Sequence, residues 1–145
     1  MKRIRVIRTT VLMAVAAGAA LALAGAFESS GPSVDRYGMV IGLKPEKAAR
    51  YEELHAAAWP GVLEMLRKCH IRNYSIYLKE VEPGKIYLFS YFEYTGTDFG
   101  ADMARMAKDP TTQKWWKETD PCQEPVPLHG EGEWWSRMKE VFRLD

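Results

Sequence analysis

The sequence predicts an α+β domain in which an antiparallel sheet carries helices on one of its faces. Three observations support this fold class. Four runs rich in β-forming residues, at 36–43, 73–79, 85–94 and 138–144, predict strands. Apolar residues at helical spacing between the first two runs predict a long helical segment, and two capped segments between the last two runs predict further helices. The resulting order is β-α-β-β-α-β in a chain of 145 residues, the length of about one domain.

A proline and an apolar stripe define the first strand and the helical region after it. Lys44-Pro45 ends the strand at 36–43, because proline has no N–H to donate to a ladder. Pro60 lies inside the helical pattern of residues 46–68, so we expect that helix to bend or to split in two near Trp59. The residues that share one helical face at steps of three and four are Ala48, Tyr51, His55, Ala58, Val62 and Leu66.

The second half of the chain predicts a hairpin, two short helices and a final strand. The turn at 82–84 joins the runs 73–79 and 85–94 into a hairpin. Asp98 is a candidate N-cap for a helix that reaches about residue 108. Asp109 and Pro110 supply a cap and a proline at the first helical position for a helix over 111–118. Residues 120–133 predict a loop, and 138–144 predict the last strand.

This order of elements is the ferredoxin-like arrangement. In the run 85–94, side chains alternate between the two faces, with Tyr87, Phe89 and Tyr91 on one face and Leu88 and Phe92 on the other. Both faces of the sheet are therefore apolar, and the helices cover only one of them. We expect a homodimer, packed sheet to sheet, to cover the other face.

The first 35 residues predict an export signal and a spacer. Residues 2–8 are basic and residues 11–23 form an uncharged apolar run. Signal peptidase cleaves after small-residue patterns such as those at 22–24 and 24–26. We therefore expect a signal peptide at 1–24, a flexible spacer at 25–35 and a folded domain at 36–145, with the mature protein periplasmic or extracellular and not stably bound to a membrane. An uncleaved anchor is the alternative, although a membrane span needs about 20 apolar residues.

Charge and motifs exclude several classes of function. The whole chain carries +1, but four positive charges and no acidic residue lie within 1–24, so the remainder carries −3. That charge, without a long basic block, argues against a nucleic-acid partner. The sequence has no P-loop, dinucleotide fingerprint, nucleophile elbow or zinc-ligand spacing, so we expect no metal and no cofactor. Cys69 and Cys122 are compatible with a disulfide or with two buried free thiols.

Five side chains are candidates for a functional site. Tyr51 and His55 are one turn apart on the helix face that should pack on the sheet, and an imidazole can both give and take a proton near neutrality. Trp115 and Trp116 point about 100° apart, so at least one should reach a cavity, an interface or the surface. Tyr74 brings a polar tip to one face of its strand. Without further information, the ordinary structural roles of buried histidine and of core or interface tryptophan are more common.

Five stretches together resemble the L-rhamnose mutarotase family. They are RYGMVIGLKP at 36–45, YEELHAAAWP at 51–60, NYSIYL at 73–78, QKWWKETDPC at 113–122 and EVFRLD at 140–145. The resemblance implies a dimeric α/β barrel with a ferredoxin-like protomer. It also implies cofactor-free interconversion of the α and β anomers of L-rhamnose or a similar 6-deoxy sugar. In this sequence the implied proton donor is His55, and the implied sugar contacts are Tyr51, Tyr74, Trp115 and Trp116.

Mutarotation requires a proton on the ring oxygen and the loss of one from the anomeric hydroxyl. We expect His55 to protonate the ring oxygen and to act as the base on closure, and Tyr51 to orient His55 or the anomeric hydroxyl. Two features depart from the family, the export signal and a loop lengthened around 130–135, which should reshape the mouth of the site. Non-catalytic sugar binding and a cofactor-free monooxygenase on the same fold are the alternative functions.

Overall fold

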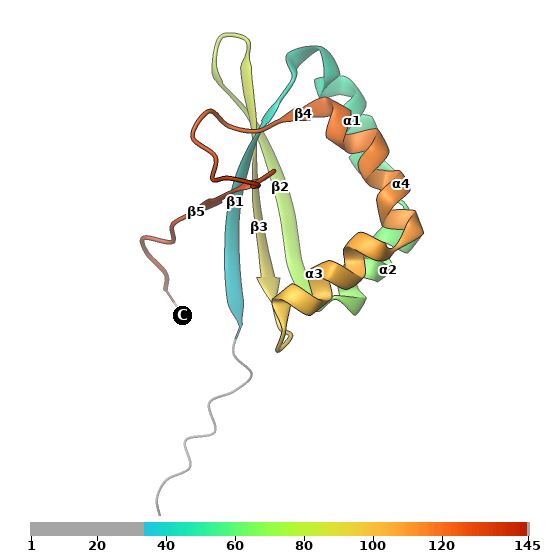
Figure 1. Ribbon diagram of the computed structural model, residues 1–145. Helices are drawn as coiled ribbons and strands as arrows, with labels where there is room; N and C mark the ends of the chain where they lie inside the picture. The colour runs from blue at the N-terminus through green and yellow to red at the C-terminus, as the bar shows by residue number, and fades with distance from the viewer. Residues whose placement is uncertain (1–33, 145) are drawn as a thin grey trace, which may run out of the picture.

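The computed structural model describes residues 34–144 and has the predicted architecture (Figure 1). One antiparallel sheet has the strand order β2-β3-β1-β4, and β5 also pairs with β1. The helices lie together against one face of this sheet (Figure 1). The ferredoxin-like arrangement is therefore confirmed. The strands are β1 Asp35–Leu43, β2 Ile71–Glu82, β3 Lys85–Tyr94, β4 Gln123–Glu124 and β5 Ser136–Met138.

The helices begin and end close to the predicted residues. They are α1 Ala48–Ala56, α2 Pro60–Lys68, α3 Phe99–Lys108 and α4 Pro110–Thr119, with short 3-10 turns at Pro45–Lys47 and Asp120–Cys122. Pro60 is the first residue of α2, so the long helical segment is split in two, as expected. The Asp98 carboxylate accepts a hydrogen bond from the Ala101 N–H at 2.9 Å and caps α3. The Asp109 carboxylate accepts one from the Thr112 N–H at 2.7 Å and caps α4, and this bond lowers the pKa of Asp109.

The prediction for the C-terminal region was wrong in two respects. The expected loop at 120–133 contains β4, which pairs with the end of β1, and the Lys44 N–H donates to the Cys122 carbonyl at 2.9 Å. The expected strand at 138–144 is instead the short β5 at 136–138, and residues 139–144 have no regular structure. β4 and β5 share one edge of β1, with β4 opposite residues 42–43 and β5 opposite residues 38–40. The place of the last strand therefore depends on where the loop after β4 returns the chain to this edge.

The two faces of the sheet are apolar, as predicted. Ile41 and Leu88 pair across β1 and β3, point toward the helices and are buried with Tyr51 of α1 in one core cluster. Phe89 alternates with Leu88 and pairs with Tyr77 of β2, whose side chain is 64% exposed on the opposite face. Among residues 34–144, no helix is long and apolar enough to cross a membrane. The expected signal peptide at 1–24 and most of the spacer lie outside the described residues.

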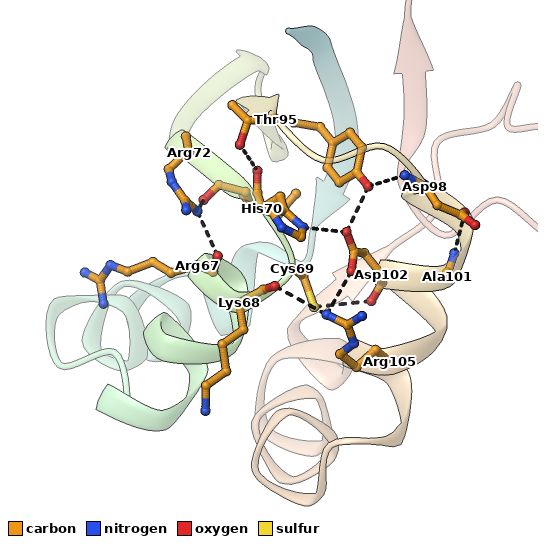
Figure 2. A network of polar contacts seen from close by, with 12 residues as sticks. Arg67, Lys68, Cys69, His70, Arg72, Thr95, Asp98, Ala101, Asp102 and Arg105 are labelled. Carbon is orange, nitrogen blue, oxygen red and sulfur yellow. Dashed lines mark hydrogen bonds and ion pairs between the residues drawn. The ribbon is translucent and has the colours of Figure 1, made fainter. Parts of the chain in front are cut away.

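A network of polar contacts centred on Asp102 links α3 to the residue before β2 and to the last residue of β3 (Figure 2). The buried Asp102 carboxylate accepts hydrogen bonds from His70 Nδ1 at 2.7 Å and from the Tyr94 hydroxyl at 2.8 Å. Arg105 lies 3.0 Å from its other oxygen. These partners, His70 first, lower the pKa of Asp102. The network joins α3 to the turn before β2 and to the end of β3, which is a structural role.

The two cysteines are buried free thiols, which decides between the two possibilities left open by the sequence. Cys69 donates a hydrogen bond to the Asp102 carbonyl at 3.2 Å, and burial raises its pKa. Cys122 lies in a different core cluster, with Ile41 and Tyr51. Both thiols are buried and pack as small apolar side chains, so we do not assign chemistry to either cysteine.

Candidate active site

A cleft between the helices and the sheet contains all five of the side chains singled out in the sequence. It consists of two cavities of about 580 and 390 Å³. Both cavities are lined by Tyr51 and His55 of α1, Tyr74 of β2, and Trp115 and Trp116 of α4. The larger cavity is otherwise mainly aliphatic, whereas the smaller one also has Asp120 and Gln123 in its wall. The fold therefore brings residues from three separate elements to one place.

His55 is held in a single tautomer by the backbone of its own helix. Its Nδ1 lies 2.9 Å from the Tyr51 carbonyl oxygen. A carbonyl oxygen can only accept, so Nδ1 carries the hydrogen, and in the neutral ring Nε2 has the free lone pair. Burial lowers the pKa of His55, and the bond to the Tyr51 carbonyl opposes that shift. Near neutral pH the ring is therefore a neutral base at Nε2.

The Tyr51 ring supports His55 by stacking on it. The two ring centroids are 4.0 Å apart with an interplanar angle of 28°. Tyr51 is only 4% exposed, and burial raises the pKa of its phenol well above the usual value. Its hydroxyl accepts a hydrogen bond from Gln123 Nε2 at 3.4 Å. Tyr51 thus orients His55 through its ring and its backbone carbonyl, and its hydroxyl remains a neutral hydrogen-bonding group.

Both indoles of the adjacent tryptophan pair reach the cleft. Trp115 is 7% exposed and meets the His55 ring edge to face, with centroids 5.2 Å apart. Trp59, which precedes α2, also packs edge to face on Trp115, with ring centroids 5.4 Å apart. Trp116 is half-buried and lines both cavities. The expectation that at least one tryptophan reaches a cavity is confirmed, and the pair forms flat apolar walls suited to the C–H face of a ring.

Tyr74 reaches the cleft from the sheet side, next to an irregularity in β2. The pairing of β2 with β3 shifts between Arg72 and Ser75, and Asn73 there has a φ of 49°. The Tyr74 ring packs edge to face on Phe92 of β3 while 43% of the residue stays exposed, and desolvation raises its pKa to about 12. Tyr77 projects from the opposite face. Tyr74 is therefore the strand's tyrosine that reaches the cleft.

Several cleft residues were missed by sequence reasoning, among them an acid, an amide and an indole. Asp120 and Gln123 follow α4, and Trp134 belongs to the loop between β4 and β5. Burial raises the pKa of Asp120. Residues 120–133 were expected to form only a connecting loop. No local spacing identifies these side chains, because their position depends on where the loop is pinned to β1.

Comparison with known proteins identifies the same family as the sequence resemblance. Residues 36–144 match the family described as L-rhamnose mutarotase. The L-rhamnose mutarotase of Oceanobacillus iheyensis is 33% identical over 116 residues, which cover 76% of this chain and 98% of that protein. The protein of the same name from Mesorhizobium japonicum is 30% identical over 100 residues, covering 65% and 90%. The crystal structure of an L-rhamnose mutarotase from Formosa agariphila has a similar fold, with a TM-score of 0.57, 21% identity, and coverage of 77% and 99%.

Proposed function

The chain belongs to the L-rhamnose mutarotase family and is a sugar mutarotase, and we propose that it interconverts the α and β anomers of L-rhamnose or a similar 6-deoxy sugar with His55 as the proton-transfer group. One observation carries the proposal for the site. The neutral His55 ring has its hydrogen on Nδ1 and its lone pair on Nε2. The ring lines an aromatic cleft together with Tyr51, Tyr74, Trp115 and Trp116. This arrangement combines a base with walls for a sugar ring.

The proposed reaction begins with His55 as a base. Nε2 takes the proton of the anomeric hydroxyl, the bond between C1 and the ring oxygen breaks as the C1 carbonyl forms, and the imidazolium gives the proton to the ring oxygen. One imidazole can serve both oxygens because both are bonded to C1. After rotation about the C1–C2 bond, the reverse steps close the ring on the other face. The lowered pKa of His55 supports this order, which places the base step before the acid step expected from the sequence.

The remaining residues have binding roles in this proposal. The Trp115 and Trp116 indoles would pack on the C–H face of the sugar. The hydroxyls of Tyr51 and Tyr74 stay protonated near neutral pH, because their pKa values are raised, and would donate hydrogen bonds to sugar oxygens. The aliphatic lining of the larger cavity suits the methyl group that a 6-deoxy sugar has in place of a hydroxymethyl group.

The pH dependence of catalysis follows from the shift at His55. Activity requires the neutral His55 ring. As the pH increases, kcat/KM should therefore rise through an apparent pKa below 6.5 and then stay level across neutral pH. The other titratable groups that line the cleft are Glu52, Asp120 and the phenols of Tyr51 and Tyr74, whose pKa values are raised. The measurement is anomer exchange by NMR at each pH, with the rate of free sugar in the same buffer subtracted. Activity that increases toward acid pH would contradict a base at His55.

We also propose that the protein is a homodimer in which two sheets face each other. The uncovered face carries Phe89 beside Tyr77, and the tail after β5 holds three strongly exposed apolar side chains. Those are Val141, Phe142 and Leu144, which are 81–87% exposed in a single protomer. Exposed apolar area of this kind is typical of an interface.

A charge placed on the uncovered face should separate the protomers. We expect the Phe89→Lys variant to be largely monomeric at micromolar concentrations where the wild type is a dimer, as measured by light scattering after size-exclusion chromatography. Leu128→Lys is the matched control, because Leu128 is 95% exposed in the loop between β4 and β5. A monomeric wild type, or a Phe89→Lys dimer as stable as the control, would contradict the proposed interface.

Export is proposed from the sequence of residues 1–24, which combines a basic start, an apolar run and small residues at the cleavage position. The mature enzyme would then act on sugar outside the cytoplasm. Cell fractionation together with the intact mass of the protein tests this. Full-length protein in the cytoplasmic fraction would overturn it.

A further inference from the structure

The Gln123 side chain connects the loop between β4 and β5 to Tyr51, the residue on which the His55 ring stacks. It is a buried polar group, with 4% of its surface exposed. Its Nε2 donates to the Tyr51 hydroxyl at 3.4 Å, and its Oε1 accepts from the indole N–H of Trp134 at 3.1 Å. All three side chains line the smaller cavity together with His55. The loop that carries Trp134 is therefore in contact with the site through a chain of hydrogen bonds.

Trp134 determines the direction of this chain. An indole N–H can only donate, so the amide oxygen of Gln123 must face Trp134 and the amide nitrogen must face Tyr51. Each group then donates to the next, from Trp134 to Gln123 and from Gln123 to the Tyr51 oxygen. The hydroxyl hydrogen of Tyr51 is left free to donate to another acceptor. Chains of this kind strengthen each hydrogen bond along their length.

The loop holds Trp134 in place with hydrogen bonds of its own. The Gly130 N–H donates to the Glu133 carboxylate at 3.0 Å, and the Glu133 N–H donates to the Gly130 carbonyl at 3.0 Å. The two ends of the loop are fixed by the pairing of β4 and β5 with β1. Trp134 is thus presented by a closed turn anchored on the sheet.

We propose that Gln123 and Trp134 are positioning residues for the sugar, because together they fix the Tyr51 hydroxyl as a hydrogen-bond donor toward an acceptor oxygen of the substrate. This inference rests on the proposed function. The raised pKa of Tyr51 supports it, since a phenol that keeps its proton can donate at every pH where the enzyme works. The loop lengthened around 130–135 then acts in substrate recognition.

The test is a double-mutant cycle with Trp134→Phe and Gln123→Leu. Trp134→Phe keeps the ring but removes the N–H, so the Gln123 amide is free to turn. We expect KM for L-rhamnose to rise about 3- to 10-fold, the size of one neutral hydrogen bond, with kcat within about twofold of the wild type. Gln123→Leu should raise KM at least as much, and Trp134→Phe should have little further effect in the Gln123→Leu background.

Gln113→Leu is the matched control. Gln113 is exposed on α4, away from the cleft, and its amide donates to the Ala107 carbonyl, so KM should not change. Wild-type KM values in both single variants, or effects that add fully in the double variant, would overturn the positioning role while leaving the proposed function intact. A wild type that does not accelerate anomer exchange would overturn the proposed function, and the positioning role with it. Trp134 is 42% exposed, so Trp134→Phe keeps the test available if Gln123→Leu fails to fold.

Discussion

Replacing His55 by alanine is expected to lower the catalysed rate of anomer exchange by about 10²–10⁴-fold, the usual contribution of a positioned acid–base group. His55 is only partly buried and bonds to the backbone of its own helix, so the fold should survive the change. Tyr51 keeps its place in the core cluster with Ile41 and Leu43. The rate of the proton-transfer step should therefore fall, with little change in the affinity for the sugar.

Saturation-transfer NMR on L-rhamnose measures this rate directly. His129→Ala is the matched control, because His129 lies in an exposed loop and bonds to the Val126 carbonyl. That variant should exchange anomers at the wild-type rate. An equally fast His55→Ala enzyme would show that another group moves the proton.

The second large effect is expected from Trp115→Ala, which should impair both stability and activity. Trp115 packs against both His55 and Trp59 and is almost fully buried, so removing its indole should cost about 3–5 kcal/mol of unfolding free energy. The same change removes a wall of the cleft and the ring that packs on His55. We expect kcat/KM to fall about tenfold or more in the folded fraction.

Urea unfolding and anomer exchange on the same samples separate the two effects of Trp115→Ala. Trp115→Phe is the conservative comparison, since a smaller aromatic ring keeps part of the packing and part of the wall. Its losses should lie between those of the wild type and Trp115→Ala. An alanine variant that is destabilised but has wild-type kcat/KM would make Trp115 a core residue only.

Local signals in the sequence were sufficient for most of the fold. Pro60 divides the helical segment, and Asp98 and Asp109 cap helices, because each acts on its own neighbours along the chain. The last strand was misplaced because its position depends on where the loop after β4 returns to the edge of β1, and the residues of 138–144 carry no information about that.

Some residues of the site could also be predicted from local patterns, whereas others depend on tertiary contacts. Helical spacing puts Tyr51 and His55 on one face, and residue type and local geometry single out Tyr74, Trp115 and Trp116. The resemblance to the family then implied roles for all five residues. Gln123 and Trp134 reach the cleft through contacts between residues distant in sequence, so no local pattern identifies them. The tautomer of His55 also required the structure, because it depends on the Tyr51 carbonyl.

The central claim is that this cleft accelerates the exchange of sugar anomers. The direct measurement is two-dimensional exchange NMR of the wild type with a panel of 6-deoxy sugars that includes L-rhamnose, at pH 7. We predict exchange well above the rate of the free sugar, greatest for L-rhamnose or a close 6-deoxy relative. Binding of these sugars without faster exchange would instead identify a sugar-binding protein and contradict the account.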